Sequence, residues 1–372
     1  MNQIKMQRIS PINVKQQHIL LKVELLQAIE RVIDEGDFIL GKEVVNFEKN
    51  IAAFCGTRFA VGVNSGTDAL FLCLKAYGIG PGDEVITAPN SFLASATAIA
   101  TTGAKVVFVD VGEDMNMDPA LIESKITPRT KAILPVHLTG KPAAMMPIMA
   151  LAKKYHLRVI EDAAQAIGAE YNGAKVGSIG DAGCFSLHPL KTLNACGDGG
   201  IVVTNDQNLY EMLLQLRNIG QKERGVAPVI GYNTRLDNIQ AAILNVKIKY
   251  LDSWNEQRRA NAQLYRHLLT DIVMLPKEEF FEKAVYHTFV IRTQRRDELK
   301  SFLSDRGVDT LIHYPIPIHL QGCFSSQGFK VGDFPVCELQ VKQILSLPIH
   351  HGLKSQEIEY VSGLIKEFIS IR

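Results

Sequence analysis

The fold is decided by two neighbouring stretches, RVIEDAAQ at residues 158–165 and DAGCFSLHPLKTLNACGDGG at residues 181–200. Each opens on a short run rich in Val, Ile, Ala or Phe, and longer amphipathic segments separate such runs along residues 58–205. Runs that are apolar on both faces and alternate with helices indicate a largely parallel sheet covered on both sides. The expected strands are 60–63, 84–88, 106–110, 132–137, 158–162, 182–187 and 201–204, with helices that include 67–75, 92–101 and 146–155. Ahead of the first strand, residues 22–35 are also expected to form a helix.

The two stretches also carry a carboxylate and a lysine that suit one kind of chemistry. Asp162 ends a predicted strand, and ligands of parallel sheets collect at the carboxyl ends of the strands. Lys191 follows 29 positions later. A desolvated lysine amine can form a Schiff base with an aldehyde cofactor, and a carboxylate can keep a pyridine nitrogen protonated. The pair therefore predicts pyridoxal phosphate chemistry, although either residue alone would be read as a surface charge or a turn residue.

Three further segments could complete such a site. Residues 64–70, NSGTDAL, follow a strand and open a helix, so free backbone amides and hydroxyls there can surround a phosphate. A simple helix cap by Ser65 or Thr67 is the alternative. Phe92 follows the next strand and could stack on a pyridine ring, or could be a core residue. Ser186, just before Lys191, offers one more hydroxyl to a phosphate.

Composition excludes several other classes of function. The 372 residues carry 40 Lys and Arg against 39 Asp and Glu, so a formal net charge of +1 gives no electrostatic case for a nucleic-acid or membrane partner. The start of the chain lacks a secretory signal pattern, and we expect a cytoplasmic location. The six cysteines form no C-x-x-C pair, so no metal site is expected and the thiols are interpreted as free.

The pattern changes after the region of alternating strands and helices. A long helical stretch covers about residues 237–269, and a smaller α+β unit follows it and ends in a helix at 356–371. We expect a large cofactor-binding domain at 1–245, which includes the N-terminal segment, and a small C-terminal domain at 246–372.

The order of these elements along the chain resembles the DegT/DnrJ/StrS group of nucleotide-sugar aminotransferases. These enzymes have the aspartate-aminotransferase-like fold of pyridoxal phosphate enzymes, called fold type I. The resemblance implies a mostly parallel seven-stranded sheet sandwiched by helices and covers nearly the whole chain. The segments that carry it are 41–48, 64–67, 136–140, 161–165, 185–186 with Lys191, 231–237 and 313–315.

The resemblance implies a role for each matching residue. Lys191 becomes the Schiff-base lysine, Asp162 the partner of the pyridine nitrogen, and Gln165 the donor to the phenolic oxygen of the ring. His137 matches a strand-end histidine of the family, and a packed structural histidine is the alternative. The remaining cofactor residues implied are Ser65, Gly66, Thr67 and Ser186 at the phosphate, Phe92 over the ring, and Asn233 at the phosphate of the neighbouring subunit in a homodimer with shared active sites.

The implied reaction is a ping-pong transamination through pyridoxal 5'-phosphate and its pyridoxamine form. Glutamate is the expected amino donor, and the acceptor is a dTDP- or UDP-linked keto-hexose, with C-3 favoured over C-4. His313, Tyr314 and Gln321 are placed near the sugar by the same resemblance. Two alternatives stay open: a sugar dehydratase of the same family, in which a histidine replaces the lysine, and a regulator that binds a sugar nucleotide or cofactor without turning it over.

Overall fold

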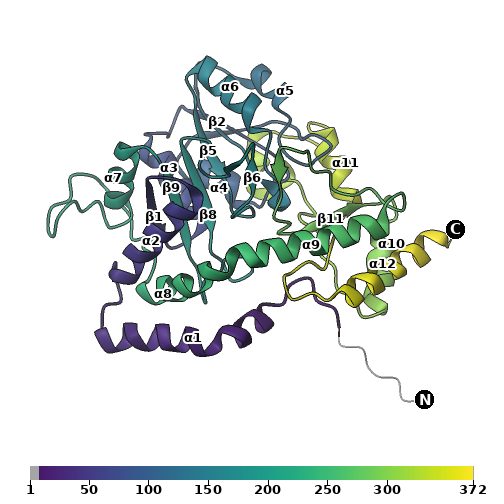
Figure 1. The fold of residues 1–372 in the computed structure, drawn as a ribbon. Coiled ribbons are helices and arrows are strands. Elements are labelled where there is room, and N and C mark those ends of the chain that lie inside the picture. The colour runs from purple at the N-terminus through teal and green to yellow at the C-terminus, as the bar shows by residue number, and fades with distance from the viewer. Residues whose placement is uncertain (1–7, 372) are drawn as a thin grey trace.

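The structure, a computed structural model, describes residues 8–371 and is built around a seven-stranded sheet (Figure 1). The strand order is β1-β9-β8-β5-β4-β2-β3, and β9 alone among these strands runs antiparallel to its neighbours. The prediction of a mostly parallel seven-stranded sheet is confirmed. The strands are β1 (Phe59–Val63), β2 (Glu84–Thr87), β3 (Lys105–Phe108), β4 (Thr130–Leu134), β5 (Arg158–Asp162), β8 (Ala182–Ser186) and β9 (Gly200–Thr204).

Helices cover both faces of the sheet because successive strand residues point to opposite sides. In β8, Cys184 joins the apolar cluster that contains α3, α4 and α7, whereas Phe185 joins the cluster formed with α2 and α8. The helices around the sheet are α2 (Lys42–Cys55), α3 (Gly66–Ala76), α4 (Ala94–Thr101), α5 (Pro119–Ile122), α6 (Met145–Tyr155), α7 (Gln207–Leu216) and α8 (Asn238–Lys247).

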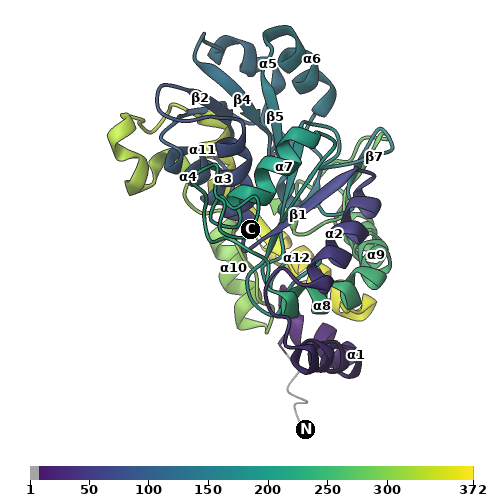
Figure 2. The ribbon, with the colours of Figure 1, turned by 90° about the vertical axis from the view of Figure 1, so that its left-hand side faces the viewer.

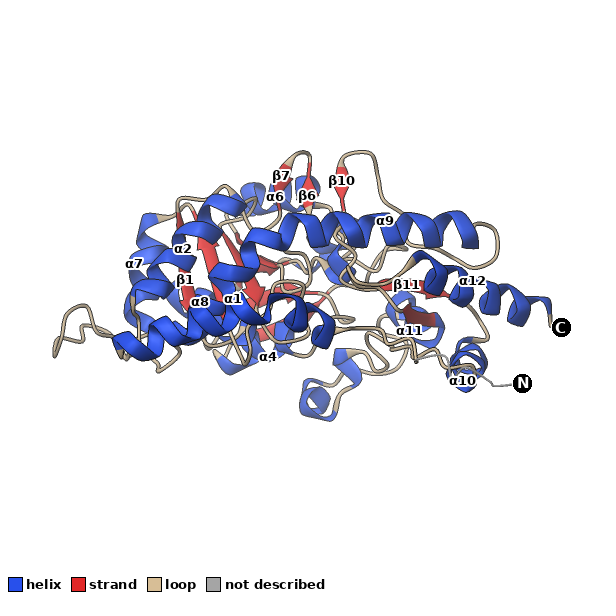
Figure 3. Ribbon diagram, turned by 60° about the horizontal axis from the view of Figure 1, so that its bottom comes forward, coloured by secondary structure: helices blue, strands red, loops and turns tan. Residues whose placement is uncertain are grey.

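A smaller unit follows at the C-terminal side of the chain. Figure 3 shows α9 (Leu251–Leu269) running along the molecule from the sheet to this unit. Its own apolar cluster contains residues of α9, α10, α12 and both strands of a two-stranded sheet. The remaining elements are α10 (Arg296–Asp305), α11 (Pro335–Gln343), α12 (Ser355–Ser370), the pair β11 (Phe289–Arg292) and β12 (Ile344–Leu347), and a small sheet of β6 (Glu170–Tyr171), β7 (Ala174–Lys175) and β10 (Glu282–Lys283).

The first helix, α1 (Val14–Glu35), begins eight residues before the expected start at residue 22. Asn13 caps it, because its side-chain oxygen accepts a 3.0 Å hydrogen bond from the amide of Gln16. Figure 2 shows α1 beneath α8, at the end of the molecule away from β2 and β4. The expected domain boundary after residue 245 falls within α8 and stays a prediction. No described helix is long and apolar enough to cross a bilayer.

Candidate active site

A cavity of about 320 Å³ opens where the carboxyl ends of β5 and β8 meet the N-terminus of α3. Its volume lies in the range usual for small-molecule sites. Most of the residues predicted from the sequence line it together: Ser65, Gly66, Thr67, Phe92, Asp162, Gln165, Ser186, Lys191, His313 and Tyr314. Residues more than 200 positions apart are therefore brought to one place, at the edge of the sheet where the sequence placed the ligand.

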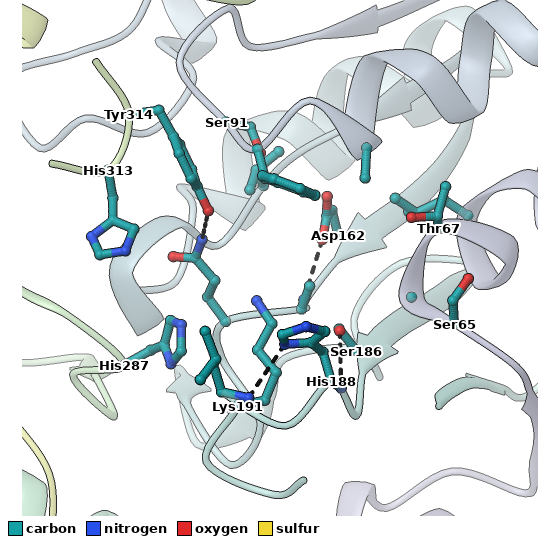
Figure 4. Close-up of a pocket in the computed structure, with 18 of the residues that line it drawn as sticks. Ser65, Thr67, Ser91, Asp162, Ser186, His188, Lys191, His287, His313 and Tyr314 are labelled. Carbon is teal, nitrogen blue, oxygen red and sulfur yellow. Dashed lines mark hydrogen bonds between the residues drawn. The ribbon is translucent and has the colours of Figure 1, made fainter. Parts of the chain in front are cut away.

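Lys191 extends into the middle of this cavity (Figure 4). Burial lowers the pKa of its ammonium group to about 8, and the nearby charge of Asp162 opposes that shift. The neutral amine is the form that attacks an aldehyde or accepts a proton. With this pKa, roughly a tenth of the Lys191 amine is neutral at pH 7, far more than for a solvated lysine.

Asp162, at the end of β5, is buried and has few partners for its charge. Burial raises the pKa of its carboxyl group. Hydrogen bonds from Ser95 and the Ala164 amide partly oppose this rise. The Ser95 hydroxyl donates to Oδ2 at 2.6 Å, and the Ala164 amide donates to Oδ1 at 3.2 Å. Since a buried carboxylate favours a cation beside it, Asp162 suits a protonated ring nitrogen placed in the cavity.

Two serines next to Asp162 were missed by the sequence reasoning. Ser91 and Ser95 are both buried, and their hydroxyl oxygens lie 2.7 Å apart. Their spacing of four residues at the start of a helix was the available signal, since positions i and i+4 share one helix face. The pair forms a short hydroxyl chain that ends at Asp162 and holds the orientation of its carboxylate.

The amide of Gln165 has a fixed orientation. Its Oε1 accepts a 2.8 Å hydrogen bond from the backbone amide of Thr139, so Nε2 must point toward the cavity. Nε2 donates to the hydroxyl of Tyr314 at 3.1 Å. The side chain therefore presents a donor to the cavity, as the role expected at the phenolic oxygen of the ring requires.

The side of the cavity with Ser65, Thr67 and Ser186 has the features of an anion cradle (Figure 4). The N-terminus of α3 supplies unpaired backbone amides, and Ser65 caps it by accepting from the amide of Asp68 at 3.1 Å. Gly66 lies so close to β8 that an added Cβ would come 2.7 Å from the Cβ of Ser186. A side chain larger than glycine there would push the helix start and the serine apart.

His287, His313 and Tyr314 form the opposite side of the cavity in Figure 4. His313 accepts or donates a 2.8 Å hydrogen bond between Nδ1 and the Ser346 hydroxyl, and burial next to Lys191 lowers its pKa to about 4. Burial also lowers the pKa of His287 far below the usual value for histidine, with smaller effects from nearby cations. Sequence reasoning missed His287. Both imidazoles are neutral at physiological pH and offer hydrogen bonds to an uncharged polar ligand.

Phe92 and Tyr314 meet at the mouth of the cavity. Their ring centroids lie 5.6 Å apart with the planes tilted by 45°. Phe92 precedes α4 and is 56% exposed, so the alternative interpretation of a core phenylalanine is wrong. A large apolar ring exposed beside a cavity is suited to stacking on a planar ligand.

Three residues singled out from the sequence lie outside this cavity. Asn233 is exposed in the loop before α8 and does not line the pocket of its own chain. The amide of Gln321 faces the carbonyl oxygen of Ile316 at 3.5 Å, also away from the lining. His137 is fully buried behind β5, where Nδ1 accepts from the Ala143 amide at 2.9 Å. Nε2 of His137 therefore bears the proton and donates to a buried glutamate, Glu161, at 2.9 Å, as a structural histidine does.

The fold and the cavity define the class of protein. A mostly parallel sheet presents a low-pKa lysine, a buried carboxylate, an exposed phenylalanine and a helix N-terminus with hydroxyl groups around one cavity. These groups fit pyridoxal phosphate: Ser65, Gly66, Thr67 and Ser186 would hold the phosphate, and Asp162 would face the pyridine nitrogen. The protein is a pyridoxal-phosphate enzyme of fold type I.

Comparison with known sequences places the chain within this class. The chain belongs to the DegT/DnrJ/EryC1/StrS aminotransferase family, whose model matches residues 20–366. The expected resemblance is confirmed: the chain is an aminotransferase, and its cofactor is pyridoxal phosphate.

Similar proteins carry names of two kinds. A Geobacillus stearothermophilus "Pleiotropic regulatory protein" is 46% identical over 96% of this chain and 97% of its own. The Streptomyces venezuelae "dTDP-3-amino-3,4,6-trideoxy-alpha-D-glucose transaminase" is 44% identical over 97% of this chain and 96% of its own. An Acidithiobacillus ferrooxidans protein named as a UDP-N-acetyl-3-dehydro-alpha-D-glucosamine 3-aminotransferase is 45% identical over 93% of this chain and 94% of its own.

Solved structures agree with the fold. The structure of DesV from S. venezuelae in complex with a ketimine intermediate is 43% identical to this chain, with a TM-score of 0.97 over 99% of this chain and 100% of DesV. Bacillus subtilis NtdA with bound cofactor PMP is 30% identical, with a TM-score of 0.91 over all of this chain and 87% of NtdA.

Proposed function

We propose that the enzyme transfers the amino group of glutamate to the C-3 keto group of a dTDP- or UDP-linked hexose. The observation that carries this proposal is the placement of Lys191 and Asp162 in one cavity with an anion cradle. The neutral histidines on the other side of the cavity, together with Gln165 and Tyr314, offer hydrogen bonds that suit the hydroxyl groups of a sugar.

The names of the relatives support this acceptor. The S. venezuelae and A. ferrooxidans relatives are both named for transamination of a nucleotide-linked sugar, and both names specify position 3. This agrees with the preference for C-3 over C-4. The base of the nucleotide differs between the two names, so either dTDP or UDP suits the proposal.

The residues of the site divide the work of the reaction between them. When bound, pyridoxal phosphate supplies an electron sink that stabilises negative charge on the carbon atom being deprotonated. Lys191 Nζ removes the Cα proton of glutamate in the first half-reaction and delivers a proton to C-3 of the sugar in the second. Asp162 holds a positive charge at the ring nitrogen, while Ser65, Thr67 and Ser186 fix the phosphate.

We further propose that the active enzyme is a homodimer. On α1, the outward face carries exposed apolar side chains at helical spacing, whereas Leu21, Leu25, Ala28 and Val32 on the inward face pack against α8. An exposed apolar stripe of this length is typical of a protein interface. The outward residues are Ile19, Leu20, Val23, Leu26 and Ile33. The exposed position of Asn233 agrees with a role in the cavity of a second subunit.

Lys191 disfavours both alternative functions, the sugar dehydratase and the regulator. A lysine, Lys191, occupies the position where the sugar dehydratases of the resemblance have histidine. A regulator that only bound a ligand would have no need of an amine with a lowered pKa. Transamination uses both the lysine at this position and its lowered pKa.

A test of the proposed function uses ¹⁵N-glutamate with a panel of dTDP- and UDP-linked 3-keto and 4-keto hexoses. Mass spectrometry of the product then reports the transferred nitrogen and the ring position. We expect ¹⁵N at C-3 of a nucleotide-linked sugar. Amination at C-4 would contradict the ring position, and a product that lost oxygen without gaining nitrogen would show a dehydratase.

A further inference from the structure

A second lysine, Lys247 at the end of α8, is completely buried outside the cavity. Buried lysines are normally paired with carboxylates, as Lys141 is with Asp114 and Glu282. Within residues 8–371, Lys247 forms no such ion pair. Burial lowers the pKa of its ammonium group to about 8. Burying an ammonium group without a carboxylate partner is energetically costly, so other interactions must account for the position of Lys247.

The three donors of the Lys247 ammonium are all used. Nζ lies 2.8 Å from the backbone oxygen of Asn194 and 2.5 Å from the Oδ1 atom of the same residue. The third partner is Nε2 of His18 on α1, at 2.7 Å. Burial and the charge of Lys247 lower the pKa of His18, so its imidazole is neutral and accepts the hydrogen bond.

Asn194, which Lys247 holds in place, in turn binds the segment that bears the active-site lysine. Its Nδ2 donates at 2.8 Å to the backbone oxygen of Lys191 and at 2.8 Å to Oε1 of Gln17. Gln17 in turn donates to the backbone oxygen of Thr192 at 3.4 Å. The backbone oxygens of residues 191, 192 and 194 are thus all held by side chains of this network.

We propose that Lys247 is a positioning residue for Lys191: it fixes Asn194, which holds the backbone of the active-site lysine against α1 and α8. The inference rests on the proposed function only in treating Lys191 as the reacting amine. Lys247 does not line the cavity, and it acts on Lys191 through Asn194.

Loss of the Lys247 ammonium would leave two buried oxygens of Asn194 without a donor. An unsatisfied buried acceptor is costly, so Asn194 would turn toward water and release the carbonyl of Lys191. The side chain of Lys191 would then be less rigidly held and better hydrated. Since burial is what lowers the Lys191 pKa, better hydration should raise it.

The test substitutes Lys247→Met and, as a matched control, Lys249→Met, which removes an exposed lysine two positions along. In the full-length chain freed of cofactor, trace acetylation across pH with mass spectrometry of the Lys191 peptide gives the pKa of that amine. We expect a midpoint near 8 in the wild type and the control, and a midpoint about one unit higher in Lys247→Met. In the holoenzyme, kcat should fall about tenfold, with a much smaller change in the KM for the sugar nucleotide.

A second variant keeps the test decisive if Lys247→Met does not fold. Asn194→Asp retains both acceptors for Lys247, so it should fold. It replaces the donor to the backbone oxygen of Lys191 with an oxygen, so it should still raise the Lys191 midpoint. A folded Asn194→Asp or Lys247→Met with the midpoint and kcat of the control overturns the proposal. The acetylation result does not depend on the reaction catalysed, so a wrong assignment of the substrate or donor would leave it unchanged.

Discussion

The hydroxyl of Ser95 donates a 2.6 Å hydrogen bond to Oδ2 of Asp162, and both side chains are buried. The bond stabilises the ionised form of a carboxyl group whose pKa burial raises. A hydrogen bond to a charged group contributes about 1.5 to 3 kcal/mol. Ser95 is therefore the direct support of the negative charge by which, in the proposed mechanism, Asp162 keeps the ring nitrogen protonated.

Ser95→Ala should move the acidic limb of the pH profile of kcat/KM toward higher pH. The donor that opposes the rise in the Asp162 pKa is removed, so that pKa rises further and the carboxylate is lost at a higher pH. A shift of about one pH unit or more corresponds to the energy of the bond. Thr97→Ala, on the same helix, is the control. An acidic limb that stays in place in Ser95→Ala would show that the hydroxyl does not act on Asp162.

Gly66→Ala should weaken cofactor binding while leaving the fold intact. The new Cβ would meet Ser186 at 2.7 Å and spread the cradle, which we expect to cost at least tenfold in affinity. Titration followed by the visible absorbance of the bound cofactor measures the Kd. Gly363→Ala on α12 is the matched control, because its Cβ would meet nothing within 4 Å. Equal affinity in the two variants would place the phosphate elsewhere.

The rate of the glutamate half-reaction should rise with pH up to about 8 and then level off. The pKa of Lys191 is lowered to about 8, and only the neutral amine can accept the Cα proton. The charge of Asp162 raises the pKa of Lys191, so Asp162→Asn should shift the rising limb of the pH–rate profile to lower pH. The same substitution should also slow the reaction. Stopped-flow absorbance with glutamate records both effects. A rising limb that moves to higher pH in Asp162→Asn would contradict the assigned effect of Asp162 on the pKa of Lys191.

Val23→Asp combined with Leu26→Asp should separate the proposed dimer. Charges on the apolar stripe of α1 oppose burial against a second copy, whereas Lys22→Asp changes the charge of the same helix at an exposed polar position. Sedimentation velocity measures the change. A double variant that sediments like the control would assign the interface elsewhere.

Shared active sites make a separate prediction. Chains with Lys191→Ala and chains with Asn233→Ala should each be inactive, but mixtures should recover part of the activity. In a mixed dimer, one of the two cavities combines an intact Lys191 with an intact Asn233. A mixture as inactive as its parts would place Asn233 outside the cavity of the partner.

The sequence was sufficient for the residues that lie in continuous motifs. Asp162, Gln165, Ser186 and Lys191 end or follow strands whose apolar pattern was visible, so their meeting at one sheet edge could be predicted. Ser95 lies 67 residues from Asp162, and only the tertiary structure, which places the start of α4 near the end of β5, brings the two together. Likewise, His287 comes from the small C-terminal unit, whose docking over the sheet has no signal in local periodicity.

The early start of α1 was missed for a similar reason. Residues 14–21 are not strongly patterned as a surface helix, because Gln17 and His18 face the network around Lys247. Polar residues that point inward do not follow the apolar spacing on which helix prediction depends. The residues that hold the active-site lysine were therefore the hardest to identify from the sequence.

The central claim is that Lys191 is the amine that binds the cofactor covalently. Reduction of the holoenzyme with borohydride, followed by proteolysis and mass spectrometry, tests it most directly because reduction makes that bond permanent. The account predicts a phosphopyridoxyl group on Lys191 in the wild type and on no lysine in Lys191→Ala. A label on another lysine, or none on the wild-type chain, would contradict it.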